Sequence, residues 1–317
     1  MYDIITVGEI LTEFLYDQVD NPLDKVGGIT GPYPSGAPAI MIDQAACLKM
    51  KTTIFAKVGD DPFGDLNINR LKFDGVDTRW ILKTKDNTTG VAFVTYFSDG
   101  SRNFLFHLRN AACGELGAEN IDESVFPGST YLHIMGCSIT GSPNLRQAVL
   151  RAIDLAVQNK VKISFDPNIR PELMRDDLKD IYTDIITKSD VLLTGYSELK
   201  KLLPDIAENP KAFIYNTNKI LVIKDGARGT RLYSHLDSFS VPTFSANELD
   251  PTGAGDCFDA TFLSMLCKKK NLREAVVVAN AAGAMAVGKR GPMEGNSSYE
   301  EICALIKAQG IPQIQPL

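Results

Sequence analysis

The sequence predicts an α/β fold: a doubly wound, mostly parallel sheet with helices on both faces, plus a small β lid. From Tyr131 onward, short β-branched runs alternate with helical segments, which is the pattern of βαβ units. Before that point, two aromatic strands joined by an Asp-Gly turn predict a hairpin. No repeat, low-complexity stretch or change of composition marks a linker. We therefore expect one domain over residues 1–317, with a lid contributed by about 10–33 and 88–110.

The N-terminal segments predict the first strands and helices of the sheet. Ile4–Glu9 begins as a β-branched run and reaches a glycine, so it predicts a buried strand with a loop at its carboxyl end. Ala37–Leu48 is small and apolar and predicts a helix, and Thr52–Gly59 predicts a second strand. Pro62–Asp74 predicts a second helix.

The lid is predicted by a hairpin. Gly90–Tyr96 and Arg102–Leu108 are rich in β-branched and aromatic residues, as strands are. The turn between them contains Asp99-Gly100, the strongest local turn signal in the chain. Because the edge of such a hairpin is exposed, it is also a candidate surface for a homodimer.

The rest of the chain alternates strand and helix. Four strands are predicted, at Tyr131–Met135, Val161–Phe165, Val191–Thr194 and Ile220–Lys224. Asn144–Asn159 carries an apolar stripe at helical spacing and predicts a helix between the first two. The remaining predicted elements are a hairpin, Arg231–His235 with Ser238–Val241, and three helices, Cys257–Cys267, Leu272–Val287 and Ser298–Ala308.

Composition and charge exclude several classes of protein. The net charge of −6 argues against a nucleic-acid partner, which would require a basic face. The six cysteines include no Cys-x-x-Cys pair, and free thiols fit a reducing compartment. No basic leader precedes the first strand, and the longest apolar C-terminal stretch, Ala275–Gly288, is too short to span a bilayer. We expect a cytoplasmic protein without a membrane partner.

A turn of small residues is the most informative feature of the sequence. Gly253, Ala254 and Gly255 precede a helical segment, and such a turn exposes unpaired N–H groups at the positive end of the helix dipole. Asp256 stands at the same place. A carboxylate repels a bound anion, so its presence suggests a base that deprotonates a hydroxyl for attack on phosphate. The alternative interpretation is that Asp256 only caps the helix.

Asp250–Phe258 resembles the C-terminal signature of the ribokinase-like (PfkB-type) carbohydrate kinases, and the resemblance covers nearly the whole chain. Asp166–Arg170, followed by proline, resembles the fructokinase and 2-keto-3-deoxygluconate kinase members. The resemblance implies a ribokinase-like fold, with a β lid over the sugar, and ATP-dependent transfer of the γ-phosphate to a sugar hydroxyl. It also implies that Asp256 is the catalytic base and that the three residues before it form the anion hole.

The same resemblance implies residues that bind the cofactors. Those expected to contact ATP are Lys224, Gly226, Gly229, Thr252 and Asn280. Glu198 is expected to organise Mg²⁺ indirectly, although Gly195 replaces the asparagine usual in the family. The metal should be held largely by phosphates and water. Asp250 is a candidate ligand for a monovalent cation such as K⁺.

The identity of the sugar is argued from the remaining residues of the predicted site. Those expected to contact it are Glu13, Gly36, Arg109, Arg170 and Asp256. Ile40 replaces an asparagine that contacts sugar hydroxyls in the family, and isoleucine has no hydrogen-bonding group. The carboxylate of Glu13 favours a neutral polyol, whereas arginines favour a sugar acid. We expect a ketohexose such as fructose, with 2-keto-3-deoxygluconate as the alternative.

Other classes of function fit the sequence less well. Gly253-x-Gly255 lacks the third glycine of a dinucleotide-binding fingerprint and lies late in the chain. No Gly-Lys-Ser/Thr segment of a P-loop is present, and the spacing in Gly136–Gly141 is wrong for a serine hydrolase. A catalytically weak protein that senses sugar or nucleotide is the last alternative, supported only by Ile40 and Gly195.

Overall fold

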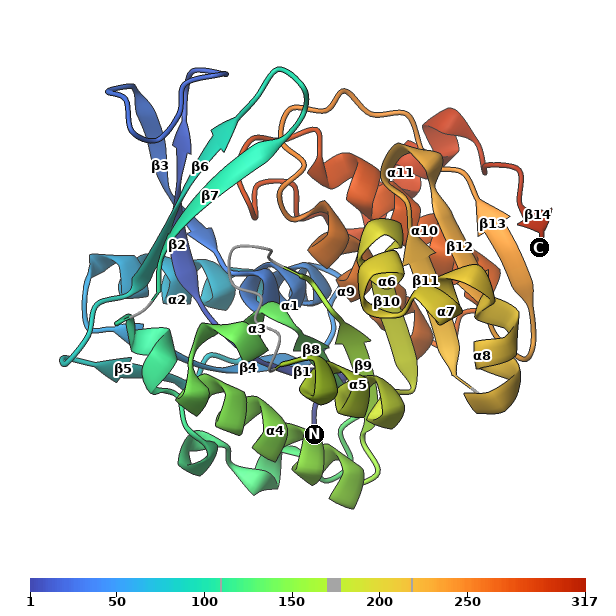
Figure 1. Cartoon of the computed structure of the whole chain (residues 1–317), viewed down its shortest axis with the longest axis horizontal. Helices are drawn as coiled ribbons and strands as arrows, with labels where there is room; N and C mark the ends of the chain where they lie inside the picture. The colour runs from blue at the N-terminus through green and yellow to red at the C-terminus, as the bar shows by residue number, and fades with distance from the viewer. Residues whose placement is uncertain (109, 170–177, 218) are drawn as a thin grey trace.

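The computed structural model of the chain describes residues 1–108, 110–169, 178–217 and 219–317. Over these residues, ten strands form one large sheet and four form a smaller one. Figure 1 shows the smaller sheet standing clear of the larger one, with helices in front of and behind the large sheet. The predicted α/β class, with a mostly parallel sheet covered on both faces, is confirmed.

The large sheet is parallel except at one edge. Its strands, in spatial order, are β14 (Gln315–Pro316), β13 (Ser238–Val241), β12 (Thr230–Tyr233), β11 (Ile220–Lys224), β10 (Val191–Gly195), β9 (Lys162–Asp166), β8 (Tyr131–Met135), β1 (Ile4–Val7), β4 (Thr52–Gly59) and β5 (Ile81–Thr84). Pairs from β11 to β5 are parallel, and those from β11 to β14 are antiparallel. The carboxyl ends of the parallel strands therefore share one edge, where ligands bind in such sheets.

The sheet is buried on both faces because alternate residues of its strands point to opposite sides. In β1, Ile4 belongs to one hydrophobic core and Ile5 to the other. The helices are α1 (Ala37–Cys47), α2 (Pro62–Asp74), α3 (Cys137–Gly141), α4 (Pro143–Gln158), α5 (Lys179–Lys188), α6 (Tyr196–Leu202), α7 (Pro204–Glu208), α8 (Pro210–Thr217), α9 (Ala254–Cys267), α10 (Leu272–Ala286) and α11 (Tyr299–Gln309). The first core includes residues of α1, α9 and α10, and the second includes residues of α4 and α5.

Local sequence signals explain where several helices begin. The Asp61 carboxylate accepts a hydrogen bond from the Gly64 N–H at 2.9 Å and caps α2, and proline follows at the first helical position. Ser142 caps α4 in the same way, and Ser298 with Glu301 forms a capping box at α11. None of the helices in the described part of the chain is long and apolar enough to cross a bilayer.

The smaller sheet has the order β3 (Ile29–Ser35), β2 (Leu11–Tyr16), β6 (Gly90–Tyr96) and β7 (Arg102–His107). In β7, residues alternate between half-buried and exposed, so Phe104 and Phe106 share one face while Leu105 is 45% exposed on the other. The two phenylalanine rings lie parallel at a centroid distance of 5.4 Å. We call this four-stranded sheet the lid.

Some elements differ from those that the sequence predicts. Helix α9 begins at Ala254 rather than at Cys257, because the left-handed backbone of Gly253 (φ 81°) turns the chain directly into the helix. The periodicity does not predict β5 or the helices from α5 to α8. Most of these elements have four to eight residues, too few to display a recognisable period.

Candidate active site

Two cavities meet at the carboxyl ends of the parallel strands. The first, of about 240 Å³, lies between the lid and α9 and is called here the sugar cavity. The second, of about 860 Å³, lies beside α10 and the β11–β12 turn and is called the nucleotide groove. Four residues line both cavities: Gly195, Lys224, Pro251 and Gly255. A molecule in one cavity therefore contacts the same wall as a molecule in the other.

The turn before α9 has the predicted form. Gly253 has φ 81°, and a Cβ at this position would lie 2.4 Å from the Pro292 carbonyl oxygen, so only glycine fits. Helix α9 then presents its first N–H groups beside the shared wall. Asp256 lies in the first turn of α9, is only 5% exposed and lines the sugar cavity. The turn and the carboxylate thus lie together where the two cavities meet.

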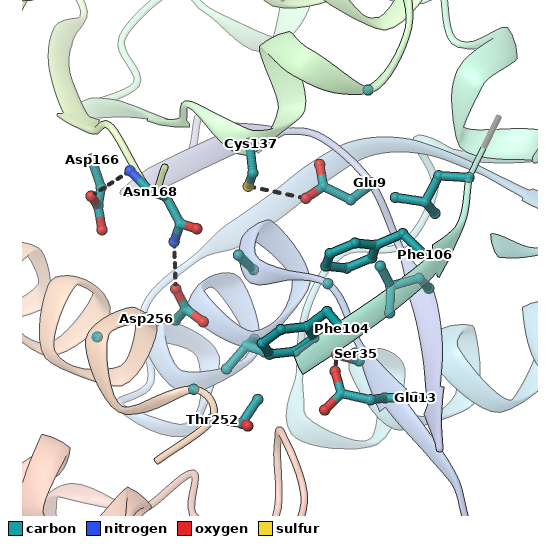
Figure 2. A pocket seen from close by; sticks show the side chains of 18 of the residues that line it. Glu9, Glu13, Ser35, Phe104, Phe106, Cys137, Asp166, Asn168, Thr252 and Asp256 are labelled. Atoms are coloured by element: carbon teal, nitrogen blue, oxygen red, sulfur yellow. Dashed lines mark hydrogen bonds between the residues drawn. The ribbon is translucent and has the colours of Figure 1, made fainter. Parts of the chain in front are cut away.

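Asp256 is hydrogen-bonded to Asn168, which lies in the loop after β9. The amide Nδ2 of Asn168 donates to the Asp256 Oδ1 at 3.3 Å, and the Asn168 N–H donates to the Asp166 Oδ1 at 2.9 Å. Figure 2 shows Asn168 between these two carboxylates. Asn168 lies two residues after the end of β9. The loop that follows this strand therefore orients the Asp256 side chain in the first turn of α9.

A buried lysine holds this strand end in place. The Lys224 Nζ lies 2.8 Å from the Asp166 Oδ2 and 2.8 Å from the Asp259 Oδ1. Burial alone would lower the pKa of Lys224, but the two carboxylates outweigh it and raise that pKa, so the lysine is charged. Burial would raise the pKa of Asp166, but Lys224 lowers it below its ordinary value, while burial raises the pKa of Asp259. Lys224 lines both cavities, and its ammonium group is engaged by these two carboxylates.

Two further carboxylates line the sugar cavity. The Glu13 Oε2 accepts a hydrogen bond from the Ser35 hydroxyl at 2.9 Å, and Gly36 follows in the wall. Glu9 accepts from the Ser138 hydroxyl at 2.6 Å and from the Cys137 thiol at 3.1 Å. Figure 2 shows both glutamates on the side of the cavity away from Asp256. The Ser35 hydroxyl thus supplies a hydrogen-bond donor for Glu13.

The remaining wall of the sugar cavity is apolar. Phe104 and Phe106 face it from the lid, and Ile40 lines it from α1. Ile40 is 2% exposed, and its Cγ2 would lie 3.2 Å from a Cβ at Gly253. Ile40 therefore packs against the turn of residues 253–255, which is called here the anion turn. The Arg102 Nη1 on the lid donates to the Thr252 hydroxyl at 2.9 Å. This bond joins the lid to the turn before α9.

The residues predicted to bind ATP lie around the nucleotide groove, with one exception. Gly226 and Gly229 line it from the turn between β11 and β12, and Asn280 lines it from α10. The Asn280 Oδ1 accepts from the Thr230 hydroxyl at 2.7 Å, and its Nδ2 donates to the Val241 carbonyl at 3.2 Å, so its side chain also holds the groove together. Thr252 lies instead on the sugar-cavity side of the turn.

The two residues predicted to organise cations hold the backbone in place. Glu198 lines the sugar cavity and accepts from the Ile169 N–H at 2.7 Å and the Gly195 N–H at 2.9 Å. Burial raises its pKa. Asp250 is fully buried and accepts from the Thr252 N–H and the Gly291 N–H.

Sequence reasoning misses several contacts of the site. Arg109 and Arg170, predicted to contact the sugar, lie outside the described residues. The bond between Asn168 and Asp256 joins residues far apart in the sequence, and no local pattern indicates it. The aromatic wall could have been found, because Phe104 and Phe106 are two residues apart on a predicted strand and must share a face.

The comparisons with known proteins agree with this geometry. The chain is 30% identical to "Fructokinase-2" of Zea mays over 91% of its length and 89% of that protein's length. It is 28% identical to "Probable fructokinase-5" of Arabidopsis thaliana over 96% and 98% of the two lengths. A solved structure from E. coli, "a putative Ribokinase II in complex with ATP and Mg+2", aligns with a TM-score of 0.90 and 40% identity, over 97% and 100% of the chains.

The family itself is shown by a match that spans most of the sequence. Residues 1–298 match the profile described as "pfkB family carbohydrate kinase". This stretch contains both cavities, the turn before α9 and the lid. The chain is therefore a member of the pfkB family of carbohydrate kinases.

Proposed function

We propose that this enzyme transfers the γ-phosphate of ATP to a hydroxyl of a ketohexose such as fructose. The observation that carries the proposal is the position of Asp256, buried at the start of α9 where the sugar cavity meets the nucleotide groove. A base at that point can reach a hydroxyl from one side while the anion turn receives phosphate from the other.

In this mechanism Asp256 takes the proton of the sugar hydroxyl as its oxygen attacks the γ-phosphorus. The bond from that phosphorus to the bridging oxygen breaks, and ADP leaves. The N–H groups of Gly253, Ala254 and Gly255 stabilise the charge on the transferring group, because they are fixed by the turn and the helix. The lid covers the sugar and excludes water, which limits hydrolysis of ATP.

We place the adenine end of ATP beside α10 and its phosphates between the β11–β12 turn and the turn before α9. The E. coli structural relative is described as a complex with ATP and Mg²⁺. Both oxygens of Glu198 accept backbone N–H groups, so the residue fits a magnesium ion held mainly by phosphates and water. When bound, the metal neutralises charge on the phosphates. A K⁺ ion near Asp250 stays a prediction.

The choice of a neutral sugar rests on the charge of the cavity. Two carboxylates, Glu9 and Glu13, line the wall away from Asp256, and carboxylates accept hydrogen bonds from hydroxyls but repel a sugar acid. Among the described lining residues, Lys224 is engaged by Asp166 and Asp259, and Arg102 donates to Thr252. The curated relatives cited above are named as fructokinases, which favours the same sugar over 2-keto-3-deoxygluconate.

A coupled ADP-release assay tests the proposal with fructose, ribose, 2-keto-3-deoxygluconate and a nucleoside, each against ATP alone. We expect fructose to give the highest kcat/KM, and ATP alone to give little turnover. The highest value with 2-keto-3-deoxygluconate would contradict the substrate assignment. Sugar binding without ADP release would identify a sensor instead.

The arrangement of the chain is proposed on similar grounds. We propose one domain over residues 1–317 whose lid comes from about 10–33 and 88–110, and a homodimer formed through the lid. The position of β7 at the open edge of the lid, with Leu105 45% exposed on it, supports the dimer, because an unpaired strand edge can pair with a second copy. Sedimentation of the wild type and of Leu105→Lys tests it, and an unchanged mass would contradict the lid interface.

The cellular compartment is a further proposal. All six cysteines are free thiols, and burial raises the pKa of the Cys113 thiol to about 12. Such inert thiols fit the reducing cytoplasm. Fractionation of cells that express a tagged full chain tests this placement.

A further inference from the structure

Asn168 adopts a left-handed backbone conformation, which asparagine enters more readily than most other non-glycine residues. Its φ is +39°, in the left-handed region that non-glycine residues rarely enter. The loop is held there because the Asn168 N–H donates to Asp166, which is itself paired with Lys224. A conformation of this kind is retained where the surrounding structure requires it.

The amide of Asn168 has a defined orientation. Its Nδ2 lies 3.3 Å from the Asp256 Oδ1 and 3.5 Å from the Met135 Sδ, and both of these atoms are acceptors. A flipped amide would place two oxygens against each other, so the nitrogen faces Asp256 and the oxygen faces elsewhere. Figure 2 shows the amide nitrogen toward Asp256 and the oxygen directed away from it.

The amide oxygen of Asn168 accepts no hydrogen bond from the described residues, although it is buried. The residue as a whole is 9% exposed and lines the sugar cavity together with Asp256. A buried acceptor that is left unpaired destabilises the folded chain. A ligand that donates a hydrogen bond in the cavity would remove this destabilisation.

We propose that Asn168 has two roles: its Nδ2 orients the base Asp256, and its Oδ1 binds a second hydroxyl of the substrate. The inference rests on the proposed function and names the class of substrate, a polyol with a hydroxyl close to the one that reacts. Asp256 and Asn168 line the same cavity and are joined through the Asn168 Nδ2, so their oxygens can meet two hydroxyls of one sugar. A sugar without the second hydroxyl leaves the Asn168 oxygen unpaired and is rejected.

Ile40 sharpens this description of the substrate. It lines the same cavity against the anion turn and offers only hydrocarbon. We therefore expect the sugar hydroxyls near the reacting one to form hydrogen bonds with Asn168 after β9, and none with the Ile40 side chain of α1. A hydroxyl that faced Ile40 would lose its hydrogen bonds to water without replacement.

The test compares the preferred sugar with its monodeoxy analogues in the wild type, Asn168→Gly and Asn168→Asp. Glycine removes the side chain and tolerates the positive φ. We expect one analogue to lose at least about 100-fold in kcat/KM with the wild type, and less than about threefold relative to the parent sugar with Asn168→Gly. Equal discrimination by both enzymes would overturn the role of the Oδ1.

The aspartate variant separates the two roles. Asn168→Asp keeps an acceptor oxygen but loses the N–H donor to Asp256, so it should retain the discrimination while kcat falls at least about tenfold. An unchanged kcat would overturn the orienting role. The KM for ATP and thermal unfolding serve as controls for folding. If no sugar is turned over, the proposed function fails, and calorimetric binding of the same sugars then decides the role of Asn168.

Discussion

The nucleotide groove and the sugar cavity are lined by different kinds of residue. The nucleotide groove is lined by turns and small residues, among them Gly226, Gly229 and Gly283, so its shape comes from the backbone. The sugar cavity is lined by large or charged side chains such as Glu9 and Phe104. The nucleotide groove should therefore keep its affinity for ATP after most substitutions that spare its glycines. In the sugar cavity, by contrast, a single substitution should change which sugar binds.

The largest effect is expected where the two cavities meet. Asp256→Asn removes the base but keeps the size of the side chain, so turnover should fall by at least about 100- to 1,000-fold, the order typical for one aimed catalytic group. Steady-state kinetics and calorimetric binding of ATP measure this. ATP binding and the melting temperature should be retained, because the fold does not depend on this carboxylate.

The exposed Asp205 in α7 provides a matched control for that substitution. Asp205→Asn removes the same charge far from both cavities and should leave kcat unchanged. Near-normal turnover in Asp256→Asn would show that Asp256 is not the catalytic base. It would also remove the argument that the reaction takes place where the two cavities meet.

A substitution in the nucleotide groove should affect ATP but not the sugar. Gly229 has φ 90°, and a Cβ there would lie 2.2 Å from the Val241 carbonyl oxygen. Gly229→Ala must therefore move the turn between β11 and β12, and we expect the KM for ATP to rise about tenfold or more, equivalent to about 1.4 kcal/mol. Gly100→Ala is the control, because Gly100 has a similar positive φ of 81°, a Cβ there meets nothing within 4 Å, and the residue lines neither cavity. Equal effects of both variants would contradict the steric argument.

A substitution in the sugar cavity should have the opposite selectivity. Ile40→Asn introduces a hydrogen-bonding group beside the anion turn, so the KM for the sugar should change about tenfold while that for ATP changes less than twofold. The buried amide should also destabilise the sugar-free enzyme by about 1–3 kcal/mol. Ile40→Val, which keeps the wall apolar, should leave the sugar preference unchanged. An equally large change in the KM for ATP would contradict the claim that the two cavities bind their ligands through separate residues.

The smallest effect concerns the sheet beneath both cavities. Burial lowers the pKa of His133 in β8 to about 3, against an ordinary value of 6.5. Between these pH values the unfolded chain binds a proton that the folded chain does not, so stability falls as the pH decreases. His133→Gln should reduce this loss by about 1 kcal/mol or more between pH 6.5 and 4, measured by denaturant unfolding. Neither KM should change at pH 7.5, and parallel pH curves would contradict the argument.

The sequence predicts the turn before α9 better than the rest of the sugar cavity. Gly253 adopts a left-handed backbone conformation (φ 81°) that favours glycine, so its meaning is readable without coordinates. Lys224 shows the limit of this reasoning: it lies where it was expected, but Asp166 and Asp259 hold its ammonium group. The partner of a long side chain depends on residues that only the folded chain brings near.

The fold follows a similar division. Apart from β5, the strands of the parallel sheet are predicted within one or two residues, because burial on both faces requires continuous apolar runs. The short helices between β10 and β11 have no such requirement and are not predicted. Likewise, no local pattern indicates the hydrogen bond from Ser35 to Glu13, which forms because β3 pairs with β2.

Four residues line both cavities, and this arrangement has a thermodynamic consequence. If occupancy of one cavity makes Gly255 or Lys224 more rigid, the second ligand meets a surface that is already ordered. The coupling is reciprocal, so the factor by which nucleotide tightens sugar equals the factor by which sugar tightens nucleotide. Under that condition each substrate acts as an effector of the other through the residues that line both cavities.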